Sequence, residues 1–228
     1  MKHKFKDLLN HLNNQQIRVI DPKILLSDYC QLDLSVTNQE LQQVDLTSSA
    51  HLQAYVDMVI ERNNAKAAYG GYLEKRNIYQ RSDYFNAQTD PKDERNIHLG
   101  LDIWAPAETS VHAAFNGKIH SYANNTNFGD YGPTIILEHS ENGQTFYSLY
   151  GHLSLKSIAN IKVELEVLQG QQIATLGAAD VNGDYPPHLH FQLILDIQNY
   201  LGDYPGVCSE NELAFYQENC PDPGAFIK

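Results

Sequence analysis

From about residue 84 onward the chain consists of short, strand-like runs of apolar and β-branched residues. Turn residues, mostly glycine, interrupt these runs about every ten residues, which is typical of antiparallel β-structure. The clearest unit comprises residues 134–139 and 145–150, two β-rich runs that flank Glu141-Asn142-Gly143. An Asn-Gly pair between two such runs predicts a β-hairpin.

The first eighty residues follow a helical period instead. Apolar residues recur at helical spacing between 49 and 63, which predicts an amphipathic helix with Ser48 or Ser49 as its N-cap. A shorter helix is expected near the start, and the segment from Pro22 to about residue 45 is expected to be extended or loop. We therefore predict an α+β, mainly β protein. A mostly helical N-terminal region covers residues 1–80, and an antiparallel β-sheet domain covers residues 81–228.

Composition excludes some function classes. The chain has 228 residues and a net charge of −12, from 16 Lys+Arg against 28 Asp+Glu. Such an acidic chain repels the phosphate backbone, so nucleic-acid binding is not expected. No run approaches the roughly 20 apolar residues of a membrane span. Asp7, Asn10 and His11 interrupt the apolar stretch that a secretory signal would need, which favours a cytoplasmic location.

The three cysteines do not form a disulfide framework, because they are too few and odd in number. Cys208 and Cys220 could pair, but free buried thiols are the favoured interpretation for them and for Cys30.

One candidate for metal chemistry is the segment His98-Leu-Gly-Leu-Asp102. A regular strand would separate residues four apart by roughly 13 Å, too far to share one ion. Gly100 within the segment and Pro106 after it disfavour a helix. The two side chains can therefore meet only across a turn, and Gly100 permits the chain to fold back.

A second candidate is the segment Pro186-Pro-His188-Leu-His190-Phe-Gln192. Read as a strand, it places His188, His190 and Gln192 on one face and the intervening apolar residues on the other. The apolar face should pack on the core, so that the histidine face lines a cleft. Two such imidazoles can serve one metal site, one as a ligand and one beside it.

The constellation of these residues indicates catalytic metal chemistry. Two histidines and one aspartate give a three-ligand set with an open fourth position, the arrangement of catalytic zinc. A third segment, Tyr150-Gly-His152-Leu153, ends the second strand of the hairpin, and Gly151 suggests a close approach of the backbone there. Taken alone, His152 would not stand out.

Together the three segments resemble the lysostaphin/LytM family of zinc metalloendopeptidases, whose pattern is H-x-x-x-D, then G-H-L, then H-L-H-F. The resemblance covers about residues 90–195. It implies that His98, Asp102 and His190 bind zinc and that His152 and His188 are catalytic. It also implies hydrolysis of peptide bonds, including those of cell-wall peptidoglycan, by a zinc-activated water. A zinc ion lowers the pKa of such a water from 15.7 to about 7.

Two segments depart from the family pattern. Gln192 stands where the family commonly has Glu, and Asn182-Gly-Asp-Tyr-Pro-Pro replaces the usual Gly/Thr-rich loop before His188. Residues 130–139 and 187–193 also resemble a branch of the family joined to aminotransferase-like and kinase-like domains, for which a role in the cell wall need not apply. Two alternatives therefore stay open: a non-catalytic domain that binds a peptide or partner, and a zinc hydrolase of another amide.

The loops around the candidate site predict its shape. Residues 122–131 are polar and rich in turn formers, and Tyr185 precedes the second motif. We expect an open groove between them, with the metal at its floor, suited to an extended peptide. The N-terminal region is expected to pack on the β domain; Asn13, Asn14 or His51 could also block the site, as N-terminal segments of some family members do.

Overall fold

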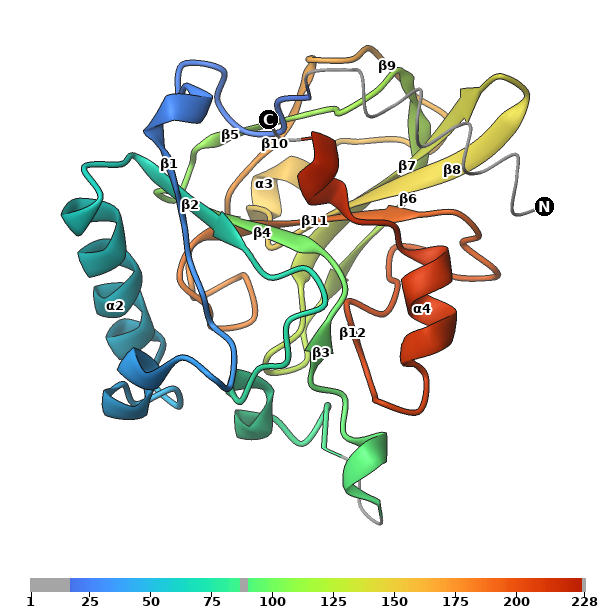
Figure 1. Cartoon of the computed structure of the whole chain (residues 1–228). Coiled ribbons are helices and arrows are strands. Elements are labelled where there is room, and N and C mark those ends of the chain that lie inside the picture. Colours follow the sequence, from blue (N-terminus) through green and yellow to red (C-terminus); the bar gives the residue numbers. More distant parts are fainter. Residues whose placement is uncertain (1–16, 87–89, 227–228) are drawn as a thin grey trace.

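The structure is a computed structural model that describes residues 17–86 and 90–226. The fold is built around one large sheet (Figure 1). Its strand order is β1-β2-β4-β11-β8-β7-β6-β9. All neighbours are antiparallel except β1 and β2. The strands are β1 (Tyr29–Gln31), β2 (Ala67–Gly70), β4 (Leu101–Trp104), β6 (Gly117–Asn125), β7 (Gly132–Glu141), β8 (Gln144–Gly151), β9 (Glu166–Val167) and β11 (His188–Ile194).

Two further strand pairs and several short helices surround this sheet. The pairs are β5 (Ser110–His112) with β10 (Gln172–Thr175), and β3 (Ile97–His98) with β12 (Val207–Cys208). The α-helices are α2 (Ser49–Arg62), α3 (Leu155–Ile158) and α4 (Leu213–Asn219). The 3-10 helices are η1 (Leu26–Asp28), η2 (Gln39–Gln43), η3 (Ile78–Arg81), η4 (Pro91–Asp93) and η5 (Pro223–Phe226).

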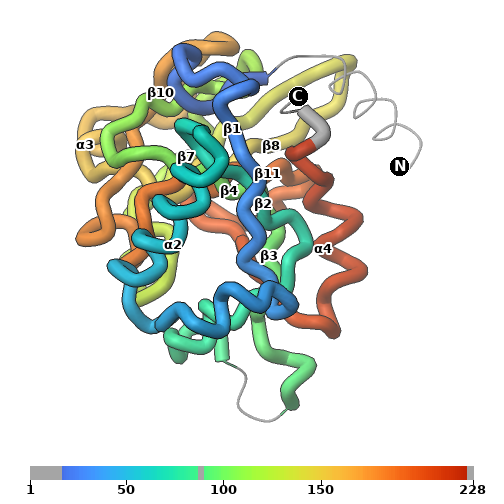
Figure 2. The backbone as a smooth tube through the Cα atoms, turned by 60° about the vertical axis from the view of Figure 1, so that its left-hand side comes forward, coloured from blue at the N-terminus to red at the C-terminus, as the bar shows by residue number. Residues whose placement is uncertain are grey.

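Helices α2 and α4 lie on opposite sides of the strands in both views (Figures 1 and 2). The described residues form mainly β-strands and few helices, as the sequence predicts. Across residues 17–86 and 90–226, no helix combines the length and apolar character needed to cross a membrane.

The predicted hairpin is confirmed in β7 and β8, which pair from Ile135 and Tyr150 to Glu141 and Gln144. Asn142 and Gly143 connect the strands with φ values of 51° and 73°. Both values lie in the left-handed region that a two-residue hairpin turn requires, and Asn and Gly adopt it at the lowest cost.

The alternation predicted for β11 is also confirmed. Leu189, Phe191 and Leu193 are buried in the main apolar core, which extends under β4, β7 and β8. The side chains between them, His190 and Gln192, bond to each other on the other face. Packing of the apolar face therefore fixes which way the histidines point.

The N-terminal region contributes both a helix and strands. Helix α2 begins and ends as predicted, and the Ser48 side chain accepts a hydrogen bond from the His51 backbone N–H as its N-cap. Strand β1 lies in the segment that was expected to be extended or loop. Strand β2 was not expected, because a run of four residues is too short to show a period. The helix expected near residues 5–12 lies outside the described residues.

The two parts on either side of residue 80 share one sheet, since β2 pairs with β4 along Ala68–Gly70. They also share a core: side chains of α2 such as Leu52 and Val56 pack in one buried cluster with Trp104 and Tyr185. This packing on the β domain is what the sequence analysis expects of the N-terminal region. The three cysteines are free thiols, also as expected.

Candidate functional site

His98 and Asp102 meet because the chain turns between β3 and β4. His98 is the last residue of β3, and Asp102 is the second residue of β4. Gly100 lies at the bend, where an added Cβ would be 2.6 Å from the His190 ring. Only glycine therefore lets the bend pass so close to the imidazole, which confirms the fold-back that the spacing predicts.

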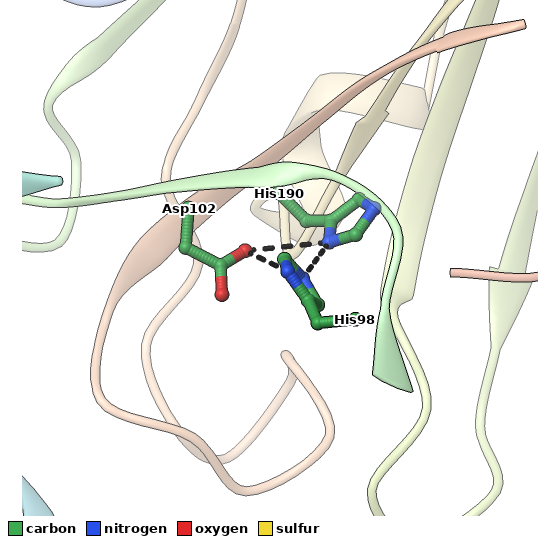
Figure 3. A group of neighbouring side chains, drawn as sticks. All are labelled: His98, Asp102 and His190. Atoms are coloured by element: carbon green, nitrogen blue, oxygen red, sulfur yellow. Dashed lines mark hydrogen bonds and ion pairs between the residues drawn. The ribbon is translucent and has the colours of Figure 1, made fainter. Parts of the chain in front are cut away.

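His190 reaches the same point from the neighbouring strand, because the register of β11 and β4 places it opposite Asp102. Figure 3 shows the three side chains pointing toward one another. His98 Nε2 lies 2.8 Å from His190 Nδ1, and Asp102 Oδ1 lies 3.2 Å from the former and 3.3 Å from the latter. All three residues are at most 2% exposed.

Backbone and amide oxygens fix the tautomers of both imidazoles. His98 Nδ1 lies 2.9 Å from the Gly71 carbonyl oxygen, which can only accept, so Nδ1 carries the proton. His190 Nε2 donates to Gln192 Oε1 at 2.8 Å. The Gln192 amide is oriented in turn by donating to the Pro205 carbonyl at 3.1 Å. Both rings therefore turn an unprotonated nitrogen toward Asp102.

Asp102 adds a third hydrogen-bond acceptor to the two unprotonated histidine nitrogens, and none of these three atoms carries a proton to donate. Its Oδ2 accepts a hydrogen bond from Arg76 Nη1 at 2.6 Å. Its Oδ1 is buried and has no hydrogen-bond partner among the described residues. Burial alone would raise the pKa of this carboxyl, but the positive Arg76 guanidinium beside it holds the pKa of Asp102 well below its usual range. The side chain is thus a carboxylate.

This donor set fits a tetrahedral metal ion. Zinc bonds of about 2.0–2.2 Å give ligand-to-ligand distances of about 3.3–3.6 Å in a tetrahedron. The two contacts of Asp102 Oδ1 are close to this range, and the two histidine nitrogens, 2.8 Å apart, would have to separate slightly around an ion. The three facing atoms, His98 Nε2, His190 Nδ1 and Asp102 Oδ1, form the one buried cluster with metal-ligand geometry found in the described residues. Because they are acceptors in mutual contact, a cation between them relieves their repulsion, and nitrogen and carboxylate ligands suit zinc.

The two other predicted histidines flank this cluster. The rings of His152 and His188 lie 4.1 Å apart, and His188 Nε2 is 3.9 Å from Asp102 Oδ1. His152 Nδ1 donates to the Asn182 carbonyl, and His188 Nδ1 donates to the Pro186 carbonyl, each at 2.7 Å. Each ring therefore keeps Nε2 free as an acceptor. The structure brings all five predicted site residues together.

Local backbone geometry holds His152 in place. Its φ of 61° lies in the left-handed region, which is uncommon for a residue other than glycine. An added Cβ on the preceding Gly151 would be 2.6 Å from the Tyr131 ring, which confirms the close approach expected there. Strain of this kind is typical of sites where the surrounding structure fixes a side chain for function.

Burial keeps His98, His152 and His188 neutral. It lowers the pKa of His98 to about 4. Burial likewise lowers the pKa of His188 and takes the pKa of His152 well below its usual range. At neutral pH these rings can therefore bind a metal ion or accept a proton.

The site lies in a cavity of about 290 Å³ that is partly open to solvent. Gly129 to Tyr131 and Tyr185 line it, as predicted. Two walls were not predicted: one from the N-terminal region and one from residues 200–216. They contribute Leu34, Leu52, Arg76, Ile78, Tyr79, Tyr200, Asp203, Tyr204, Pro205, Gly206, Val207, Glu212 and Tyr216. These segments have no recognisable motif, so only tertiary structure brings them to the site.

Two contacts beside this cluster, made by Arg76 and Tyr131, escaped sequence analysis. Arg76 has no motif around it, and nothing in its local pattern indicates an ion pair with Asp102. Tyr131 packs against both His152 and His190, with ring centroids 5.5 Å and 5.0 Å away. His51, considered above as a blocking residue, is exposed and pairs with Asp45 instead.

Comparison with known proteins agrees with this site. Residues 96–200 match the sequence profile of peptidase family M23. The cell division protein DipM of Caulobacter vibrioides is 35% identical over 94 residues, which cover 41% of this chain and 14% of DipM. The peptidoglycan DD-endopeptidase ShyC of Vibrio cholerae is 33% identical over 100 residues, which cover 43% of this chain and 20% of ShyC. The chain thus spans a minor part of these relatives.

Among solved structures, the lysostaphin catalytic domain of Staphylococcus simulans is 26% identical, with a TM-score of 0.39. The match covers 68% of this chain and 94% of that domain. The stretch matched by the family profile contains His98, Asp102, His152, His188 and His190. Residues 96–200 of this chain therefore resemble peptidase family M23, the LytM/lysostaphin type.

Proposed function

We propose that this protein is a zinc-dependent peptidase, with His98, Asp102 and His190 as metal ligands and His152 and His188 as catalytic residues. The observation that carries the proposal is the buried set of three facing acceptors, of which Asp102 Oδ1 has no other partner among the described residues. The match of residues 96–200 to a peptidase family supports the reaction type.

The two catalytic histidines would act on the water and the scissile peptide. Zinc at such a site supplies Lewis acidity, which polarises a carbonyl and lowers the pKa of a water to about 7. The Nε2 atoms of His152 and His188 are acceptors in their neutral tautomers. One of them takes the proton from the attacking water and can return it to the departing amine, while the other orients the reacting oxygen.

The proposed substrate is a peptide of the bacterial cell wall. This follows from the relatives, since ShyC is named a peptidoglycan DD-endopeptidase. The walled cavity favours a second candidate, hydrolysis of a short peptide or small amide, because about 290 Å³ lies at the small end of ligand pockets.

Metal content is the first test. Protein purified without chelators is expected to contain about one zinc per chain, bound by three protein ligands. Mass spectrometry of the metal and titration of the stripped protein measure this. The loaded protein should then be assayed on muropeptides and on free dipeptides, which separates the two substrate classes. A protein that holds no zinc and takes up none would contradict the proposed function.

A second test concerns the hydrogen bond behind His190. Gln192→Leu removes the acceptor of the His190 Nε2 proton, so the ring can rotate or change tautomer. We expect its zinc affinity to fall about 10- to 100-fold, as for other partners of ligand histidines. Gln192→Glu, which keeps an acceptor at the same reach, is the matched control and should lose less. Equal zinc dissociation constants for wild type and Gln192→Leu would contradict this role.

A further inference from the structure

Arg76 joins the N-terminal region to the metal cluster. It lies between β2 and η3, outside the residues that match the family profile. Its side chain is buried and donates from Nη1 to Asp102 Oδ2 at 2.6 Å and from Nε to Glu74 Oε2 at 2.5 Å. Two carboxylates are thus held by one guanidinium.

We propose that Arg76 is a positioning residue for the metal centre, which makes Asp102 a ligand through one oxygen only. This inference rests on the proposed function, because it assigns a role toward the bound zinc. By occupying Oδ2, the guanidinium leaves Oδ1 as the oxygen that faces His98 and His190. A carboxylate that binds through one oxygen leaves room for a water and a substrate carbonyl in the remaining positions.

The guanidinium is itself held rigidly. Glu74 fixes its Nε edge, and Glu74 Oε1 accepts a hydrogen bond from the Leu34 backbone N–H at 3.2 Å. The Trp104 ring lies 5.8 Å from the guanidinium carbon. A planar fork of this kind presents several donors in fixed directions, which the single ammonium of lysine cannot do. The N-terminal backbone therefore fixes the position of Asp102 through Glu74 and Arg76.

The same region supplies a second hold on the ligands. The Gly71 carbonyl, just before Arg76, accepts the His98 Nδ1 proton. An added Cβ on Gly71, whose φ is 108°, would be 2.1 Å from Arg76 Nη2. Glycine at this position therefore leaves the space that the Arg76 side chain occupies. Two of the three metal-cluster residues are thus oriented by a single loop that precedes the matched domain.

A competing effect has the opposite sign. The positive guanidinium repels a metal cation, so its removal would tighten zinc binding if charge alone mattered. Loss of positioning would instead weaken binding, typically by about 10- to 100-fold for a partner of a metal ligand. The sign of the change in zinc affinity therefore decides between a positioning role and a merely electrostatic one.

The experiment compares wild type with Arg76→Gln, Arg76→Lys and Glu74→Gln. Zinc dissociation constants come from chelator competition, and coordination number comes from the visible spectrum of the Co²⁺-substituted protein. Arg76→Gln should bind zinc about 10- to 100-fold more weakly. Its Co²⁺ absorption should weaken, because Asp102 is free to bind through both oxygens and raise the coordination number. Arg76→Lys and Glu74→Gln should shift both readouts in the same direction by smaller amounts.

Arg81→Gln is the matched control. Arg81 is a buried arginine of the same region that pairs with Asp184, so its loss tests general damage without touching Asp102. It should keep the wild-type zinc affinity and Co²⁺ spectrum. Should Arg76→Gln fail to fold, the lysine and Glu74→Gln variants carry the test.

Outcomes for the two proposals differ. Unchanged or tighter zinc binding in the Arg76 variants, with an unchanged Co²⁺ spectrum, would overturn the positioning role while the zinc site stands. A wild-type protein that binds no zinc would overturn both.

Discussion

Replacing His190 by alanine is expected to abolish both zinc binding and hydrolysis, whereas replacing His152 should abolish hydrolysis alone. His190 Nδ1 is one of the three facing atoms of the metal cluster, so its loss leaves two ligands. His152 instead lies beside His188 and is bonded to the Asn182 carbonyl. Loss of its proton transfer should cost about 10²- to 10⁴-fold in turnover.

Zinc analysis and steady-state kinetics on the same preparations check this pair of results. His120→Ala is the control, since His120 is a half-buried strand histidine that contacts Ser121 and Tyr147 rather than the cluster. It should keep both zinc and activity. Equal loss of zinc from the His152 and His190 variants would show that His152 is a ligand and not a catalytic group.

Removal of residues 1–80 is expected to produce an insoluble or zinc-free protein. The deletion strips β2 from β4 and leaves an unpaired strand edge, which promotes aggregation. It also uncovers Trp104 and Tyr185, whose burial in the shared core is worth about 1.5–3 kcal/mol for each large side chain. Arg76 and the Gly71 carbonyl are lost as well.

Solubility, thermal unfolding and zinc titration of the truncated protein measure this. Deletion of residues 1–16 alone is the milder comparison, because it keeps both strands and Arg76. A soluble truncated protein with higher activity than the full chain would contradict this view. The N-terminal region would then be a cover over the site and not a part of it.

The sequence predicts those elements whose pattern is local. Asn142-Gly143 specifies its hairpin through backbone conformation, and strict alternation in β11 specifies which face carries His188 and His190. The motif spacing also assembles the five site residues. In each case a few neighbouring residues contain the physical cause.

The remaining features depend on contacts between distant segments. Strand β2 has four residues and no period, and only pairing with β4 makes it a strand. Arg76 and Asp102 are 26 positions apart, and their ion pair depends on how the N-terminal loop packs. The two additional cavity walls, from the N-terminal region and from residues 200–216, have the same origin.

His190 lies directly opposite Asp102 across β11 and β4, so the candidate metal site forms only when these two strands pair in this register. Side chains alternate faces along a strand, so a slip of one residue would bring Leu189 or Phe191 opposite Asp102 and turn the imidazole to the core. A bound ion is then compatible with one alignment of the two strands. Metal binding during folding would therefore favour the native register of β11 and β4 over registers shifted by one residue.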